Sequence, residues 1–179
     1  MGLSSKHHIL CNPLEDSKKR FLLGKKGRST LLAIALNPST ANENTLDPTS
    51  RNIEKIAAKS GCDGWWLVNL YPLRTTNPKN LPSKADPKIA KQNLQFIKSI
   101  FKNPDYRIHK VLCCWGNHVD DHSYLNDELE KILTVIRKYP IPCYSLGHTK
   151  LGNPYHPSPM AINRFLGGLN KISLKQSPI

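Results

Sequence analysis

The sequence predicts an α/β fold: a three-layer α/β/α sandwich with a mostly parallel central sheet of about four strands plus an N-terminal hairpin. Short apolar runs, typical of buried strands, alternate along the chain with longer segments whose apolar residues recur at helical spacing. Strands that alternate with helices need crossover connections, and these favour parallel pairing. No repeat or interdomain linker interrupts the pattern, so residues 1–179 are predicted to form a single domain.

The first half of the chain is predicted to contain the hairpin, a helix and a strand. The segment RFLLGKKGRSTLLAIAL suits a short strand, a Gly-Lys-Lys-Gly turn and a buried strand over residues 31–36. Asp47 is predicted to cap a helix that begins at Pro48 and ends near Ser60, before Gly61. The run WWLVNL is predicted to be the next buried strand. Residues 1–18 are a candidate flexible arm.

The second half is predicted to add two longer helices, two strands and a short last helix. In order, these are the helix KIAKQNLQFIKSIF, the strand KVLCCW, the helix LNDELEKILTVIRKY, the strand PCYSL and a helix from Met160. Residues 170–179 are a candidate flexible tail. In parallel sheets, ligands bind beyond the carboxyl ends of the strands. The loops that contain NPST, NLYPLRTT, WGNH and GHTKLGNPYHPSP are therefore expected to meet at that edge.

The net charge favours a partner rich in phosphate. The chain has 26 lysines and arginines against 13 acidic residues, a formal net charge of +13, and its pI is near 9.7. Glu130 is the last acid, and a basic block, KKRFLLGKKGR, occupies residues 18–28. A lysine-rich soluble surface is the alternative explanation, but this distribution favours DNA or RNA as the partner.

Several other classes of protein are disfavoured. No apolar run approaches the ~20 residues of a membrane span, and the N-terminus lacks the apolar segment of a secretory signal, so no membrane partner is expected. The five cysteines show neither CxxC nor zinc-ligand spacing, which indicates a reduced, cytoplasmic protein without a metal site. No Gly-rich phosphate loop, HExxH or G-x-S-x-G motif is present, and no cofactor is expected.

Two asparagines at strand ends are candidate binding residues. Asn37 ends the first buried strand, where it could break the strand into a turn or hold a water or a base edge. Asn69 ends the strand WWLVN, and its carboxamide could cap the next turn or match the hydrogen-bonding edge of a pyrimidine. Arg74 follows as a solvated loop charge or a phosphate contact.

His156 is the sharpest candidate for catalysis. It lies in YHPSPM, where prolines restrict the backbone and remove donors. A neutral imidazole held rigidly can donate a hydrogen bond to charge that develops during a reaction, although a structural role is the alternative. Solvated or capping roles are expected for His109, His118 and His148. Asp47 could act as a general base, but helix capping explains it better.

Motifs over most of the chain resemble a bacterial and phage family, the domain of unknown function numbered 1643. The matching segments are LNPSTA, DPTSR, GCDGWWLVNLYPLRTTNP, CCWGNH and LGHTKLGNPYHP, in this order between residues 20 and 159. That family carries no established activity, so this resemblance leaves the reaction open.

The same segments are similar, more remotely, to those of the uracil-DNA glycosylase superfamily. ALNPST resembles its first motif, which implies that Asn37 positions the attacking water. GWWLVNLYPLRT resembles the strand whose terminal asparagine, here Asn69, reads the uracil edge. VLCCWGNHV is similar to the strand that supports the pocket, through Trp115 and Gly116. HPSPMAINRFLGG resembles the segment with the catalytic histidine, here His156.

The resemblance also implies how a nucleic acid is held. The target base would leave the duplex, and Met160 would fill the gap as an apolar wedge. His156 would stabilise negative charge on the departing base. Tyr71 is a candidate to stack on the base, with Trp65 and Trp66 as alternatives, because no phenylalanine stands at the superfamily's spacing. Contacts to the surrounding nucleic acid are expected from Ser39, Arg74, Lys150, Ser158, Met160 and Arg164.

Two departures from the superfamily affect the expected chemistry. The first motif has no acidic residue, which leaves water activation weak. Ser39-Thr40 replace its usual Tyr-His, so the tyrosine that screens out thymine is missing. The leading hypothesis is a hydrolase of N-glycosidic bonds that excises a base from DNA or RNA. The alternatives are a non-catalytic nucleic-acid-binding module of the same fold, whose binding would weaken steeply with salt, and an enzyme acting on free nucleosides or nucleotides.

Overall fold

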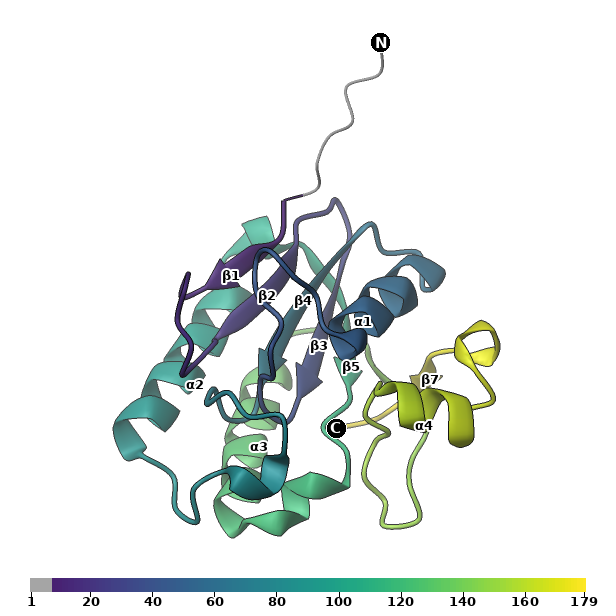
Figure 1. Cartoon of the computed structure of the whole chain (residues 1–179). Helices are drawn as coiled ribbons and strands as arrows, with labels where there is room; N and C mark the ends of the chain where they lie inside the picture. The colour runs from purple at the N-terminus through teal and green to yellow at the C-terminus, as the bar shows by residue number, and fades with distance from the viewer. Residues whose placement is uncertain (1–7) are drawn as a thin grey trace.

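The computed structural model describes residues 8–179 as a seven-stranded sheet with helices on both faces (Figure 1). The strands lie in the order β1 (Leu10–Asn12), β2 (Leu22–Lys25), β4 (Gly64–Asn69), β3 (Thr30–Ala35), β5 (Ile108–Cys113), β6 (Cys143–Ser145) and β7 (Lys175–Gln176). The central strands β4, β3, β5 and β6 are parallel, and β1, β2 and β7 add antiparallel edges. The α/β class with a parallel centre is confirmed.

The number of strands exceeds the predicted four or so because both ends of the chain contribute edge strands. Residues 1–7 of the proposed arm lie outside the described residues, but β1 follows within that arm and pairs with β2. The proposed tail contains β7, which pairs with β6. Strands of two or three residues carry little periodicity, so no sequence pattern distinguished them from loops.

The predicted hairpin between the first two apolar runs is wrong. β2 pairs with β1 and β4, whereas β3 pairs with β4 and β5, so β4 lies between them. The connection from β2 to β3 crosses the start of β4 at very close range: a Cβ on Gly27 would lie 2.4 Å from the backbone nitrogen of Gly64. Every residue of β3 is buried, as suits a strand covered on both faces with a parallel neighbour on each side.

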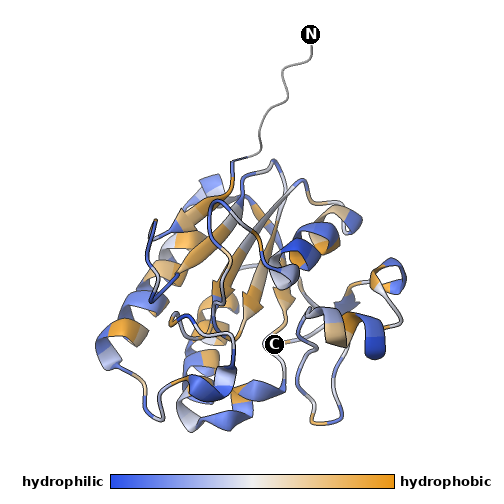
Figure 2. Cartoon of the chain, viewed as in Figure 1, coloured by the Kyte–Doolittle hydropathy of each residue, from blue (hydrophilic) through white to orange (hydrophobic). Residues whose placement is uncertain are grey.

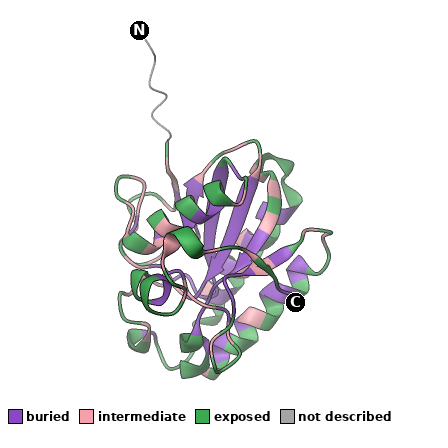
Figure 3. Ribbon diagram, turned by 90° about the vertical axis from the view of Figure 1, so that its right-hand side faces the viewer, coloured by how far each residue is buried: buried purple, intermediate pink, exposed green. Residues whose placement is uncertain are grey.

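Two apolar cores lie on opposite faces of the sheet. The helices that cover it are α1 (Pro48–Lys59), α2 (Pro87–Lys102), α3 (Ser123–Ile136) and α4 (Pro159–Arg164). Ile53 of α1 packs in the same cluster as Leu31, while Ile97 of α2 and Ile132 of α3 pack with Leu32. Figure 2 shows the apolar residues gathered on the strands, and Figure 3 shows the buried sheet between helices with exposed outer faces.

The helix starts follow the local sequence closely. Asp47 Oδ1 accepts a hydrogen bond from the backbone N–H of Ser50 at 2.8 Å, and Pro48 is the first helical residue of α1. Gly61, with φ of +81°, follows the end of that helix. The capping role predicted for Asp47 is therefore confirmed.

The parallel centre places four loops at one edge of the sheet. The segments after β3, β4, β5 and β6 all leave the carboxyl ends of their strands, and the one after β6 leads into α4 (Figure 1). The segment after β5 forms the short 3-10 helix η3 (Asn117–Asp121). None of the helices between residues 8 and 179 is both long and apolar enough to cross a membrane.

Candidate functional site

His156 is held between the end of β5 and the start of α1. The backbone N–H of Gly116 donates to the carbonyl of Pro154 at 3.1 Å, and Asn52 Nδ2 of α1 donates to the carbonyl of Pro157 at 3.0 Å. Gly116 has φ of +73°, and a Cβ there would lie only 3.0 Å from the Cβ of His156. A larger residue at Gly116 would push the histidine segment away, so the structure brings these two predicted residues together.

The imidazole of His156 is uncharged at neutral pH. Burial lowers its pKa from 6.5 to about 4, and the charge of nearby His118 acts in the same direction. The carboxylate of Asp47 opposes this shift but does not overcome the loss of hydration. His156 can therefore donate a hydrogen bond as a neutral group, as the sequence suggested, and does not serve as a cation.

This low pKa makes the stability of the protein depend on pH. Between about pH 6.5 and pH 4 the unfolded chain binds a proton at His156 that the folded chain does not bind. The free energy of unfolding is therefore expected to fall as the pH drops through this window, by at most about 3 kcal/mol. Denaturant unfolding of wild-type and His156→Gln protein at several pH values measures it; parallel pH curves for the two proteins would contradict it.

Asn69 is buried beneath the sheet edge and bonded to an arginine. The residue is only 1% exposed, and its Oδ1 accepts from Arg20 Nη2 at 3.5 Å, while its Nδ2 has no partner among the described residues. Arg20 is equally buried, and its Nη1 donates to the carbonyl of Ala41 at 2.8 Å. Burial lowers the pKa of Arg20 to about 10, so it stays charged at neutral pH. Asn69 thus has its acceptor engaged and its donor free.

Sequence reasoning missed Arg20, because an arginine in the basic block of residues 18–28 looked like part of a solvated surface. Only the pairing of β2 with β4 and the bond to Ala41 reveal that this side chain lies inside the fold. The alternation of buried and exposed residues on a strand could not show it, since Arg20 precedes β2.

Tyr71 and Trp115 are buried in the core. Both belong to the core cluster on the face of α2 and α3, with exposed fractions of 0% and 7%. The Tyr71 ring packs edge-to-face on Tyr124, and its hydroxyl accepts from the backbone N–H of Asp86 at 2.8 Å. A ring without accessible surface cannot stack on a base in this conformation. Trp65 and Trp66, the alternatives to Tyr71, are also buried.

Asn37 and Arg74 tie the loops after β3 and β4 together. Asn37 Nδ2 donates to the carbonyls of Pro38 and Thr75, both at 2.9 Å, while no bond from another described residue reaches its Oδ1. Arg74 donates to backbone carbonyls, including those of Ser39 and Ala41, so most N–H groups of its guanidinium are already hydrogen-bonded. Arg74, Ser39 and Thr75 also line a cavity of about 430 Å³.

The remaining predicted contacts lie on the surface around α4. Ser158 Oγ caps this helix by accepting from the N–H of Ala161 at 3.2 Å, so it fixes the start of the helix that contains Met160. Met160 is 64% exposed, an unusual placement for a large apolar side chain. Arg164 is exposed beside the ring of Phe165, and Lys150 is exposed at the tip of the preceding loop.

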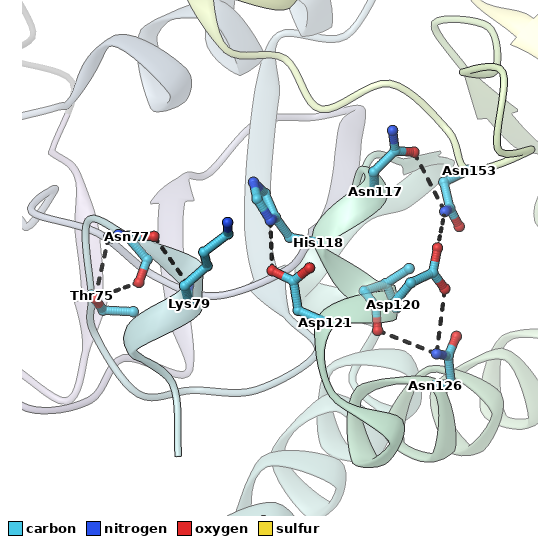
Figure 4. Close-up of polar contacts among 10 residues, drawn as sticks. Thr75, Asn77, Lys79, Asn117, His118, Asp120, Asp121, Asn126 and Asn153 are labelled. Atoms are coloured by element: carbon cyan, nitrogen blue, oxygen red, sulfur yellow. Dashed lines mark hydrogen bonds and ion pairs between the residues drawn. The ribbon is translucent and has the colours of Figure 1, made fainter. Parts of the chain in front are cut away.

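A histidine–aspartate pair on η3 was not anticipated as functional. His118 Nδ1 lies 2.7 Å from Asp121 Oδ2, with the two side chains 50% and 29% exposed (Figure 4). The sequence suggested a solvated or capping role for His118 and gave it no partner. The usable signal was the three-residue spacing of His and Asp in NHVDD, directly after a buried strand.

The loop after β6 is fastened to η3 beside this pair. Asn153 Nδ2 donates to Asp120 Oδ2 at 2.7 Å (Figure 4). Thr149 Oγ1 donates to Asn117 Oδ1 at 2.6 Å. Two segments that are far apart in the sequence are thus held together at the carboxyl edge of the sheet. Within residues 8–179, no group of three or more potential metal-ligating side chains was found.

Comparisons with known proteins identify a family. A family model described as a protein of unknown function (DUF1643) matches residues 20–158, which is most of the chain and includes every predicted site residue except Met160 and Arg164. Searches among curated proteins and among solved structures each gave no match.

Proposed function

This chain belongs to the DUF1643 family, and from its fold and site we propose that it is a nucleic-acid-binding hydrolase that cleaves N-glycosidic bonds and releases a base from DNA or RNA. The observation that carries the proposal is His156, a neutral imidazole held rigidly at the carboxyl edge of a parallel sheet. Breaking an N-glycosidic bond leaves negative charge on the departing base. A neutral imidazole can stabilise that charge by donating an N–H hydrogen bond to it.

The surface around this histidine suits a nucleic acid. The formal net charge of +13 favours binding to phosphates, and Lys150 and Arg164 contribute exposed basic groups on either side of His156 in the sequence. Met160, exposed four residues after His156, is an apolar group able to enter a base stack. In this arrangement Asn37 Oδ1 accepts a hydrogen bond from the attacking water.

A second candidate function is a nucleic-acid-binding module without turnover. It is favoured by the burial of Asn69, Tyr71 and Trp115, since a flipped base needs accessible pocket walls. The two functions share the same basic surface and differ only in whether a base is released.

The proposal is tested by incubating the protein with oligonucleotides that contain uracil, mismatched, deaminated or alkylated bases. We expect at least one DNA or RNA substrate to lose a base. Abasic sites in DNA are detected by cleavage in alkali, and base release from RNA is detected by chromatography because alkali cuts RNA itself. No release from any substrate, together with binding that weakens steeply as salt rises, would instead support the binding module.

A further inference from the structure

The pair formed by His118 and Asp121 has the geometry of a base and its orienting acid. The two atoms in contact, His118 Nδ1 and Asp121 Oδ2, are 2.7 Å apart, so the proton of the neutral ring is best placed on Nδ1. The other ring nitrogen, Nε2, then carries a free lone pair, and the side chain is half exposed to solvent. No hydrogen bond from another described residue occupies Nε2.

The position of this pair relates it to the two residues of the proposed reaction. β5 and β3 are adjacent parallel strands, so η3 and the loop that starts at Asn37 leave neighbouring points of the same sheet edge. Gly116, two residues before His118, lies against His156. The segment that contains the pair therefore starts at the sheet edge next to two segments, the one with His156, which would hold the base, and the one with Asn37, which would hold the water.

The charged groups around His118 are few and come from several elements. Asp121 and Asp120 lie on η3 itself, and Asp120 is engaged by Asn153. Lys79, in the 3-10 helix η1 (Pro78–Asn80), lies on an element that packs against η3 (Figure 4). His156 is also in electrostatic contact with His118 and is neutral above about pH 4, its pKa.

The proposed reaction lacks a group that removes a proton from water. The segment Asn37–Thr40 contains no acid, and a carboxamide can orient water without deprotonating it. The role of His156 is to donate a hydrogen bond, so it is not available as a base. We propose that His118, oriented by Asp121, is the general base that deprotonates the attacking water; this inference rests on the proposed N-glycosidic hydrolysis.

The step balances with water as the only co-reactant. Water oxygen bonds to the anomeric carbon of the sugar while the bond from that carbon to the base nitrogen breaks. The bonding pair leaves with the base, whose negative charge meets the N–H of His156. His118 Nε2 takes the proton from the water and later releases it to solvent, and the base gains a proton from solvent. Asp121 touches no reacting atom and acts as a positioning residue.

The inference is tested by measuring base release by three variants, His118→Ala, His118→Gln and Asp121→Asn. The matched control is His109→Ala. His109 is an exposed histidine near the start of β5, the strand whose far end leads to η3. We expect His118→Ala and His118→Gln to lose about 10²-fold or more in the rate constant, without loss of oligonucleotide affinity, because a general base contributes roughly 10²- to 10⁴-fold. His109→Ala should retain the wild-type rate.

The pH dependence distinguishes a base from a structural residue. An acidic limb in the rate profile of the wild type should be absent from that of His118→Gln, because glutamine has no group that ionises in this range. Asp121→Asn should lower the rate constant with little change in oligonucleotide affinity, because the ring of His118 loses the carboxylate that orients it. Unfolding curves check that each variant folds, which the exposure of both side chains favours.

Two outcomes would overturn the inference and differ in what they imply. If wild-type protein releases a base but the His118 variants keep its rate and its acidic limb, the general base is another group while the proposed function stands. If wild-type protein releases no base from any substrate, the proposed function fails and the inference fails with it.

Discussion

His156→Ala is expected to lower the rate constant of base release by roughly 10²- to 10³-fold, the cost of removing one donor from an anion-stabilising site. Binding of the oligonucleotide should persist, because the proposed phosphate contacts involve other, exposed residues such as Lys150 and Arg164. Single-turnover base release measures the first effect, and a salt titration of binding measures the second.

The effect should be specific to a neutral donor at this position. His156→Gln retains an N–H donor and should recover part of the rate that His156→Ala loses. His148→Ala removes an exposed histidine from the same loop and serves as the control. Equal activity of wild-type, His148→Ala and His156→Ala proteins would contradict the role given to His156.

Gly27→Ala is expected to lower the free energy of unfolding by about 3 kcal/mol or more. Its added Cβ would lie 2.4 Å from the nitrogen of Gly64 and 2.5 Å from Asp63 Oδ1, and the first of these is backbone that cannot rotate away. Relief would require moving the start of β4, a central strand of the sheet. Chemical denaturation of the wild type and the variant measures the loss.

Gly61→Ala separates steric overlap from backbone strain. Gly61 has φ of +81°, and a Cβ added there would meet nothing within 4 Å, so its substitution costs only the left-handed conformation, about 1 kcal/mol. The φ of Gly27 lies outside that region, so its cost is contact alone. If Gly27→Ala lowers the free energy of unfolding no more than Gly61→Ala does, the chain around Gly27 does not pass as close to the start of β4 as described.

Local patterns predicted the helices and the buried strands well. Asp47 and Pro48 mark the start of α1 because their effects act within one turn of the chain, on backbone N–H groups that no other residue satisfies. The runs that form β3 and β4 were recognisable because a strand covered on both faces needs apolar residues throughout.

Pairing and side-chain placement were predicted less well. The first apolar run was joined to its neighbour in sequence, whereas the fold inserts β4 between them. Arg20 looked like a surface charge and is buried against Asn69 and Ala41. Tyr71 was predicted to stack on a base, yet the fold directs it into the core under Asp86. Each of these outcomes depends on residues distant in the sequence.

The α/β class, the presence of the helices and the four polar loops follow from the sequence alone, because periodicity and capping are properties of neighbouring residues. Which polar side chains lose contact with water, and which distant segments come together, follows only from the folded structure. Packing buried Arg20 and Asn69 and set Gly116 against His156. Desolvation and hydrogen-bond partners come from packing between distant segments, and these set the neutral state of His156 on which the proposed chemistry depends.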